Sequence, residues 1–188
     1  MRLKEKDDMI DQAGIMMAQG LGTASERIQG VNDNMSQSHY HEYFEIYYLE
    51  AGERFHMVED QLYHMEQGEF MIFPPYVMHH SYGEKNVPFK RLVLYFTPEE
   101  VLWPSILTEL KEEIGVYQVD IRERQEIHRL MEILLKEQNN PGLHHDEFNQ
   151  GIINVLLLLI LRQKHPERAS ENSSRIGEVI RYIHMHYQ

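Results

Sequence analysis

The chain has 188 residues, which is enough for one barrel-sized domain followed by a helical extension. It contains no cysteine, so disulfides and thiolate metal sites are excluded, and any metal must be bound by nitrogen and oxygen ligands. Its net charge of −12, from 18 basic and 30 acidic residues, opposes binding to a phosphate backbone. The first residues lack the apolar core of a signal peptide, and the longest apolar run, 155–161, is too short to span a bilayer. We therefore expect a soluble, cytoplasmic protein with no membrane partner.

The first 35 residues carry few structural signals. Apolar residues such as Ala13 and Met17 would share one side of a short helix over 8–17. The glycines between 20 and 30 indicate a loop or an irregular strand. We therefore predict an amino-terminal arm over 1–35.

Short strands with frequent turns follow. The predicted strands cover residues 40–49, 53–58, 61–65, 69–73, 77–82 and 89–96. Such regular spacing is typical of an antiparallel barrel or sandwich. Because side chains two apart share a face of a strand, His39, His41 and Glu45 point to one side. The opposite side is also largely apolar, which favours a sheet closed on itself.

Two histidine-containing motifs resemble the two motifs of the cupins. They read His39-x-His41-x3-Glu45-x6-Gly52 and Gly68-x5-Pro74-x4-His79. The resemblance implies a small double-stranded β-barrel in which four potential ligands meet. One position departs from the pattern, because Tyr76 stands where cupins usually have glycine.

Within the cupins, a longer set of residues resembles the sensory domain of AraC-type transcription regulators. The set comprises Glu45, Tyr48, Gly52, Tyr63, Gly68, Pro75 and His79. The resemblance extends over roughly residues 36 to 188. It implies a mixed fold, β then α, in which a cupin-like double-stranded β-barrel precedes a helical dimerisation segment.

After residue 97 the hydrophobic period becomes helical. A helix or helical turn is predicted to begin at 98–107, and helices are predicted at 121–138 and 146–163, the last of which is apolar nearly all round. Such a helix must be covered on more than one side. The side around Ile153, Leu157 and Ile160 has no obvious cover within the chain, so we predict a homodimer with much of its interface on this helix.

The last residues form a polar linker and the start of an amphipathic helix from Arg175. This helix resembles the first helix of the AraC-type DNA-binding module, so we interpret the chain as the front part of a longer regulator. DNA would then be bound only through the missing module. The predicted division is an arm at 1–35, a barrel at 36–98, a helical dimerisation segment at 99–165, and a linker with a truncated module at 166–188.

The four motif residues His39, His41, Glu45 and His79 have a metal interpretation and a non-metal one. Neutral imidazoles and a carboxylate suit a divalent transition metal such as Zn, Ni, Mn or Fe. Alternatively, they form a polar cluster that is hydrogen-bonded inside the barrel or contacts an organic effector without metal. The sequence leaves both open.

Aromatic residues supply further candidate ligands. A ring-shaped effector such as a sugar would stack on two or three of them, although core packing is the better explanation for any single one. The candidates are Tyr43, Tyr47, Phe55, Tyr63 and Tyr82. Arg91 could meet an anionic ligand but is expected to be solvated at a strand end, and His56, His64 and His80 are expected at the surface or rim.

These features predict the effector-sensing and dimerisation domain of an AraC-type transcription regulator, with no reaction of its own. Ligand in the barrel and DNA at the missing module would be separate sites with coupled binding free energies. The alternative is a metal-dependent cupin enzyme, a dioxygenase or sugar isomerase that uses the same four residues. A plain binding module without regulation is a third possibility.

Overall fold

A computed structural model describes residues 11–31, 34–35, 37–84, 86–112 and 114–162. The predicted linker and truncated module at 166–188, and the outer ends of the helices predicted at 8–17 and 146–163, lie outside these residues. In chain order the elements are α1 (Gln12–Ala18), β1 (Thr23–Val31), β2 (Phe44–Ala51), β3 (Arg54–Val58), β4 (Gln61–Met65), β5 (Phe70–Phe73), β6 (His79–Tyr82), β7 (Pro88–Phe96), η1 (Pro98–Glu100), α2 (Pro104–Glu112), β8 (Val116–Tyr117), α3 (Ile121–Asn139) and α4 (His145–Leu161).

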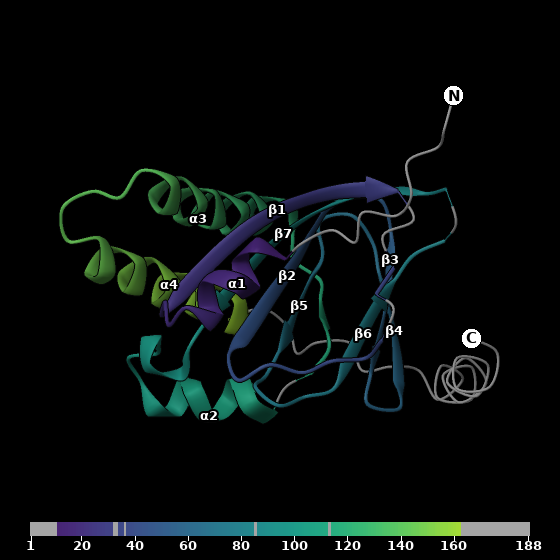
Figure 1. Cartoon of the computed structure of the whole chain (residues 1–188), viewed down its shortest axis with the longest axis horizontal. Helices are drawn as coiled ribbons and strands as arrows, with labels where there is room; N and C mark the ends of the chain where they lie inside the picture. The colour runs from purple at the N-terminus through teal and green to yellow at the C-terminus, as the bar shows by residue number, and fades with distance from the viewer. Residues whose placement is uncertain (1–10, 32–33, 36, 85, 113, 163–188) are drawn as a thin grey trace.

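The strands form two antiparallel sheets, followed in the chain by helices that pack at one side (Figure 1). One sheet has the order β1-β7-β2-β5-β8 and the other β4-β3-β6. Buried residues from both sheets, such as Tyr47, Tyr63 and Val93, belong to one hydrophobic cluster, so the sheets share an interior. The fold is therefore β then α, as predicted, but the described strands do not close into a single barrel.

β2 is buried on both faces, as the sequence predicted, but not because its sheet closes on itself. One face contributes Phe44, Ile46 and Tyr48 to a cluster that also contains residues of α3 and α4. The other face contributes Tyr47 and Leu49 to the interior between the sheets. Helices thus cover the outer face of this sheet, and a strand covered on both faces reads as apolar throughout.

β1 lies inside the segment predicted as an arm. It pairs antiparallel with β7 along its whole length, from Thr23 opposite Phe96 to Val31 opposite Pro88. Ala24 and Ile28 are buried, but Glu26 stands between them and Gly30 follows, which obscures the alternation of apolar residues in the sequence. The five-stranded sheet therefore begins before residue 36.

α1 packs against the interior through Ala13 and Met17. The backbone N–H of Ala13 donates to Glu26, and the hydroxyl of Tyr95 on β7 donates to Asp11. These contacts hold α1 against the strands that carry the interior side chains.

The two long helices after the sheets begin within one residue of their predicted starts, and only the first predicted helical segment differs clearly. α3 starts where Asp120 accepts hydrogen bonds from two backbone N–H groups of its first turn. Where a helix or helical turn was predicted over 98–107, residues 98–100 form a 3₁₀ turn, and α2 begins at Pro104, a residue well suited to a first helical turn. No helix in the described ranges is long and apolar enough to cross a membrane.

The side of α4 that was predicted to be uncovered is the core of the domain. Ile153, Leu157 and Ile160 are each 0% exposed and pack in the cluster formed with the outer face of the sheet and α3. Asn154, the one polar residue in this run, is buried because its side chain accepts from the Leu102 N–H and donates to the Glu100 carbonyl. The predicted interface around these three residues is therefore wrong.

Candidate functional site

The interior between the sheets is lined by alternate residues of each strand. Glu45, Tyr47 and Leu49 face inward from β2, and Arg54, His56 and Val58 face inward from β3. His79 and Ser81 on β6 and Arg91 on β7 complete a polar lining. We distinguish two groups in it: the histidine cluster, consisting of His39, His41, His79 and Glu45, and the arginine cluster, consisting of Tyr47, Arg54, His56, Ser81 and Arg91.

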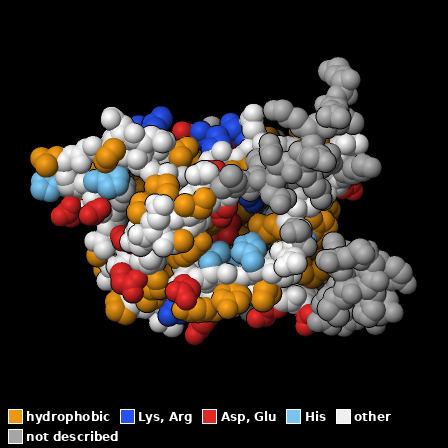
Figure 2. Space-filling model, viewed as in Figure 1, with side chains coloured by type: hydrophobic (Ala, Val, Ile, Leu, Met, Phe, Trp, Pro, Cys, Tyr) orange, Lys and Arg blue, Asp and Glu red, His pale blue; other side chains and the backbone are white. Residues whose placement is uncertain are grey.

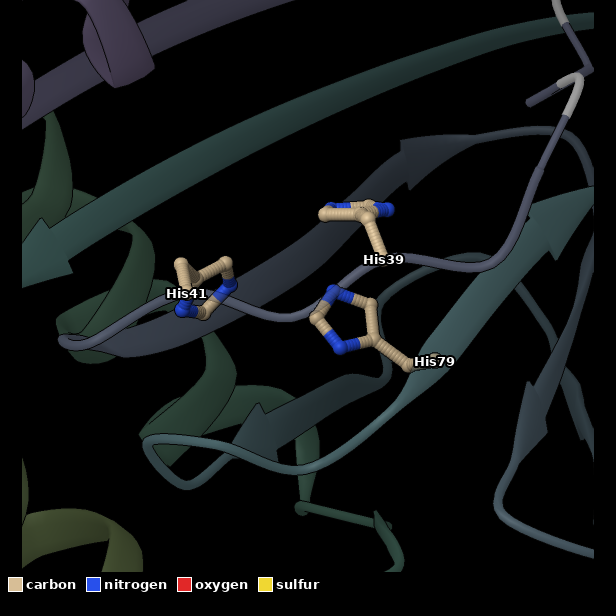
Figure 3. A group of neighbouring side chains, drawn as sticks. All are labelled: His39, His41 and His79. Carbon is tan, nitrogen blue, oxygen red and sulfur yellow. The ribbon is translucent and has the colours of Figure 1, made fainter.

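In the histidine cluster, the backbone holds two of the rings side by side. The segment that precedes β2 carries His39 and His41, and His79 begins β6 (Figure 3). His39 and His79 exchange both backbone hydrogen bonds, at 3.0 and 2.9 Å. One ring nitrogen from each of the three histidines lies within 4.8 Å of the others. Glu45 contacts two members of this trio.

The hydrogen bonds of His41 and His79 fix which nitrogen carries the proton. Nδ1 of His41 lies 2.7 Å from the Tyr43 carbonyl, and Nδ1 of His79 lies 2.9 Å from the Val77 carbonyl. A carbonyl only accepts, so both Nδ1 atoms are protonated. In a neutral ring the Nε2 atom then carries a lone pair, which is the form that binds metals.

Both Nε2 atoms face the same carboxylate oxygen. Oε2 of Glu45 is 3.1 Å from Nε2 of His41 and 3.5 Å from Nε2 of His79. Burial favours the neutral acid, but hydrogen bonds from His41 and His79, which require a proton on Nε2 of each ring in addition to the one on Nδ1, outweigh it and hold the pKa of Glu45 well below its usual value. Burial, and then the neighbouring His79, lowers the pKa of His39 to about 4, so this ring is neutral at pH 7.

This donor set fits a divalent transition metal. Metal–nitrogen and metal–oxygen bonds of about 2 Å place neighbouring ligand atoms roughly 3 Å apart, which is the separation between Glu45 and His41. Two rings are oriented by carbonyls, as is usual for metal-binding histidines. The residues predicted for a metal are therefore brought together, with Glu45 in contact with His41 and His79.

The arginine cluster was largely missed by the sequence reasoning. His56 is 0% exposed and Arg91 8% exposed, whereas both were expected at the surface. The His56 ring meets Tyr47 edge-on at 4.5 Å, and the Arg91 guanidinium lies 5.2 Å from the centre of the Tyr47 ring. Arg54 donates to the Ser81 hydroxyl at 3.3 Å.

The predicted aromatic ligands divide between two faces. Tyr43, Tyr47 and Tyr63 pack in the interior cluster. Phe55 and Tyr82 stack on each other, with ring centres 5.5 Å apart, on the opposite face of the three-stranded sheet, where Phe55 also stacks on the exposed His64. The structure does not bring these two to the site. His80 is buried as well, not at the rim as expected.

A cleft of about 600 Å³ opens beside the histidine cluster. Its lining includes Tyr43, whose ring stacks on His41 at 4.3 Å, and Tyr76. Histidine side chains gather in the middle of the face shown in Figure 2, with acidic and hydrophobic side chains around them. Tyr76 has a φ of 65°, in the left-handed region that the glycine of the cupin pattern would adopt without strain.

A second group of possible metal ligands lies on the outer face, between β2 and α3. It consists of Glu50, His128 and Glu132. Arg27 forms ion pairs with both carboxylates, and Lys90 lies 3.4 Å from Glu50. Because cations already surround the carboxylates, this group acts as an ion-pair network that fastens α3 to the sheet.

Two facing antiparallel sheets with a histidine cluster inside, followed by packed helices, define a cupin-like domain with a helical extension. The chain belongs to the family of the AraC-like ligand binding domain, whose profile matches residues 27–174. No curated protein matches the chain.

Solved structures are similar to this one to different degrees. The structure is similar to that of the AraC-like transcriptional activator CuxR, with a TM-score of 0.52, 10% identity, and coverage of 86% of this chain and 56% of that one. The chain thus spans little more than half the length of that activator. A cupin from Methanocaldococcus jannaschii has a TM-score of 0.37 and 17% identity, with 40% of this chain and 70% of that chain covered. Oxalate decarboxylase from Bacillus subtilis has a TM-score of 0.37 and 16% identity, with 45% and 24% covered.

Proposed function

We propose that this chain is the effector-sensing domain of an AraC-type transcription regulator and binds a small molecule between its two sheets. One observation carries the proposal: the Tyr47 hydroxyl and both ring nitrogens of His56 are buried and have no hydrogen-bond partner among the described residues. Leaving such groups unpaired costs about 1–3 kcal/mol each, so an interior that only had to be stable would not keep them. A ligand with polar groups satisfies them.

We further propose that the histidine cluster binds a divalent transition metal, with His39, His41 and His79 as nitrogen ligands and Glu45 as the oxygen ligand. When bound, the metal would supply a Lewis acid that polarises an oxygen of the ligand. The same cluster is the observation that favours the alternative function, a metal-dependent cupin enzyme. A search for turnover of bound small molecules by the metal-loaded protein distinguishes a sensor, which returns the ligand unchanged, from an enzyme.

The partners of the chain follow from this role. We place the homodimer contact on the exposed stripe of α4, in which Phe148 is 42% and Val155 48% exposed, while the neighbouring Ile152 and Leu159 are half-buried and pack partly against the core. These positions are spaced by three and four residues, so they share one face of the helix. A two-fold pairing of this stripe would present two DNA-binding modules to paired half-sites in the cytoplasm.

The effector-sensing role is tested by removing one hydroxyl that faces the interior and, as a control, one that faces away from it. Small sugars and organic acids are screened for a rise in the melting temperature of the purified chain. Tyr47→Phe, which removes an interior hydroxyl, should weaken binding of a hit by roughly fivefold or more. Tyr82→Phe, which removes a hydroxyl on the opposite face, should leave it unchanged. Equal affinity in both variants would place the ligand outside the interior.

A further inference from the structure

We propose that the cleft beside the histidine cluster binds an organic cation, such as an alkylammonium or an alkylguanidinium compound. The cation would lie between the exposed ring of Tyr76 and the carboxylates of Glu42 and Glu99, which all line the cleft. This site lies outside the interior between the sheets, so the inference goes beyond the effector-sensing function and does not rest on it.

The cleft has the size and the fixed walls of a small-molecule site. Its volume is about 600 Å³, within the range of roughly 300–1,000 Å³ that is usual for ligand pockets. The backbone N–H of Tyr76 donates to the His41 carbonyl at 2.8 Å, so the turn after β5 is fastened to the segment before β2. The N–H of Thr97 donates to the Gly22 carbonyl at 2.9 Å and fixes the residues that follow β7. The cleft is therefore formed before any ligand arrives.

Most of the lining is apolar. It includes three proline rings and two further apolar side chains, from Pro74, Pro75, Pro98, Met17 and Val77. Proline has no backbone N–H, so these walls offer apolar area and few hydrogen-bond donors. An organic cation gains by burying its alkyl groups against them, whereas a small hydrated metal ion gains nothing from such a surface.

Tyr76 keeps an exposed aromatic ring in the lining of the cleft. Its side chain is 65% exposed, and its φ of 65° is costly for a residue with a side chain. Residues held in such backbone conformations cluster at ligand sites. The ring of Tyr40, which is 57% exposed, lies 6.3 Å from that of Tyr76. Because the face of a tyrosine ring attracts a cation within about 6 Å, this pair offers an attraction that a neutral ligand would not receive.

Two carboxylates in the lining are not ion-paired within the described part of the chain. Glu42 and Glu99 are exposed, and neither forms an ion pair with another described residue. Hydrogen bonds from its own backbone N–H and from Thr97 hold the pKa of Glu99 below its usual value, so this group is ionised at pH 7. Both negative charges are therefore available to an incoming cation.

The inner wall of the cleft lies in a negative field. Burial is the main reason that the pKa of Tyr43 rises to about 12, and the charges of Asp11 and Glu45 raise it further. Lys111, at the exposed end of α2, is the one cation among the described residues of the lining. Its flexible, hydrated side chain is outnumbered by two carboxylates in the lining and two near Tyr43. The cleft is therefore negative on balance and favours a cationic ligand.

The test follows the backbone N–H signals of Tyr76 and Val77 by NMR while matched compounds are added at millimolar concentration and constant ionic strength. The pairs are choline and neohexyl alcohol, and butylguanidinium and butylurea, in which the second compound has a similar shape without the charge. The proposal expects at least one cation to shift these signals while its neutral counterpart does not. The two pairs separate an ammonium ligand from a guanidinium ligand.

Variants connect the shift to the cleft. Glu42→Gln and Glu99→Gln should each weaken binding of the cation by about two- to fivefold, as expected for an exposed charge. Tyr76→Leu, which removes the ring and keeps an apolar side chain, should weaken it by a similar factor. Lys111→Gln should strengthen it. Glu109→Gln, at an exposed position of α2 outside the lining, is the matched control and should leave it unchanged.

Three results would overturn the proposal. They are a neutral compound that binds as tightly as its charged partner, undiminished binding in Glu42→Gln and Tyr76→Leu, and no shift of the Tyr76 and Val77 signals by either cation. Each would leave the test of effector sensing unaffected. Tyr47→Phe, in the interior, should leave cation binding unchanged. If that variant weakens it as much as Tyr76→Leu does, the cation lies in the interior, which would support effector sensing and remove the separate site in the cleft.

Discussion

Nε2 of His41 lies 3.1 Å from Oε2 of Glu45, and the other nitrogen of the same ring donates its proton to a backbone carbonyl. A lone pair and a carboxylate at this distance repel each other unless a proton or a metal cation lies between them. The contact between His41 and Glu45 therefore requires a positive charge between the two side chains, in the interior between the sheets.

We predict that the purified chain binds one equivalent of a divalent transition metal and that His41→Ala abolishes this binding. Losing one imidazole removes both a ligand and the partner that holds Glu45. Elemental analysis after gel filtration measures the metal content. The matched control is His64→Ala, which removes a histidine from the exposed side of the other sheet and should keep the metal. Full metal content in His41→Ala would place the metal elsewhere.

The pH dependence of stability provides a test of His56. Its pKa in the folded protein is well below 6.5, so below about pH 6.5 the unfolded chain binds a proton that the folded chain does not. The free energy of unfolding should therefore fall as the pH is lowered from 6.5, by up to about 1.4 kcal/mol per pH unit for this residue. Above pH 7 both states are neutral at this position and the contribution is constant.

Urea unfolding at several pH values, in the presence of a chelator, measures this slope. His56→Gln should reduce it, while His64→Gln should not. The low pKa of His39 acts in the same direction and remains in both variants. An unchanged slope in His56→Gln would mean that the folded protein protonates this ring as readily as the unfolded chain does.

The sequence predicted the elements that have a clear period. α3 was placed nearly as the structure has it because its apolar residues repeat every three to four residues, whereas β2, which is buried on both faces, was predicted to begin at 40 and begins at Phe44. The sequence leaves β1 open between a loop and an irregular strand because it carries Glu26 on its inward face and Gly30 near its end. A charged residue at an inward position makes the sequence of a strand look like that of a loop, unless the residue that faces it across the interior is known.

The site was predicted in part for a related reason. The motif spacing brought the histidine cluster together, but on β3 the sequence favoured Phe55 as the inward residue and the structure turns His56 inward. Side chains alternate, so a choice shifted by one residue reverses the face of every position on a strand. Phe55 pairs with Tyr82 and His56 with Ser81, and only pairing across β3 and β6 reveals which pair faces the interior.

The backbone at Tyr76 predicts a stabilising substitution. A left-handed φ costs a residue with a side chain roughly 1–2 kcal/mol, and glycine avoids this cost while losing about 0.4–1 kcal/mol through the greater freedom of the unfolded chain. The Tyr76 side chain is 65% exposed, so little burial is lost. Tyr76→Gly should therefore raise the free energy of unfolding by up to about 1 kcal/mol.

Tyr40→Gly is the matched control for this substitution. Tyr40 is similarly exposed, at 57%, and does not have a positive φ, so the change to glycine should destabilise the protein there. Chemical denaturation of both variants gives the comparison. If both substitutions lower the free energy of unfolding equally, the contacts of the Tyr76 side chain in the cleft stabilise the protein by more than its left-handed backbone destabilises it.

The exposed stripe of α4 predicts how the chain associates. Val155→Glu places a charge at the centre of the stripe and should convert a dimer to a folded monomer, because burying an unpaired carboxylate in the contact costs several kcal/mol. Leu157→Glu should instead unfold the domain, since Leu157 is 0% exposed in the core. Sedimentation at micromolar concentration and circular dichroism separate these outcomes. A monomeric wild-type chain, or a Val155→Glu variant that remains dimeric, would exclude this stripe as the interface.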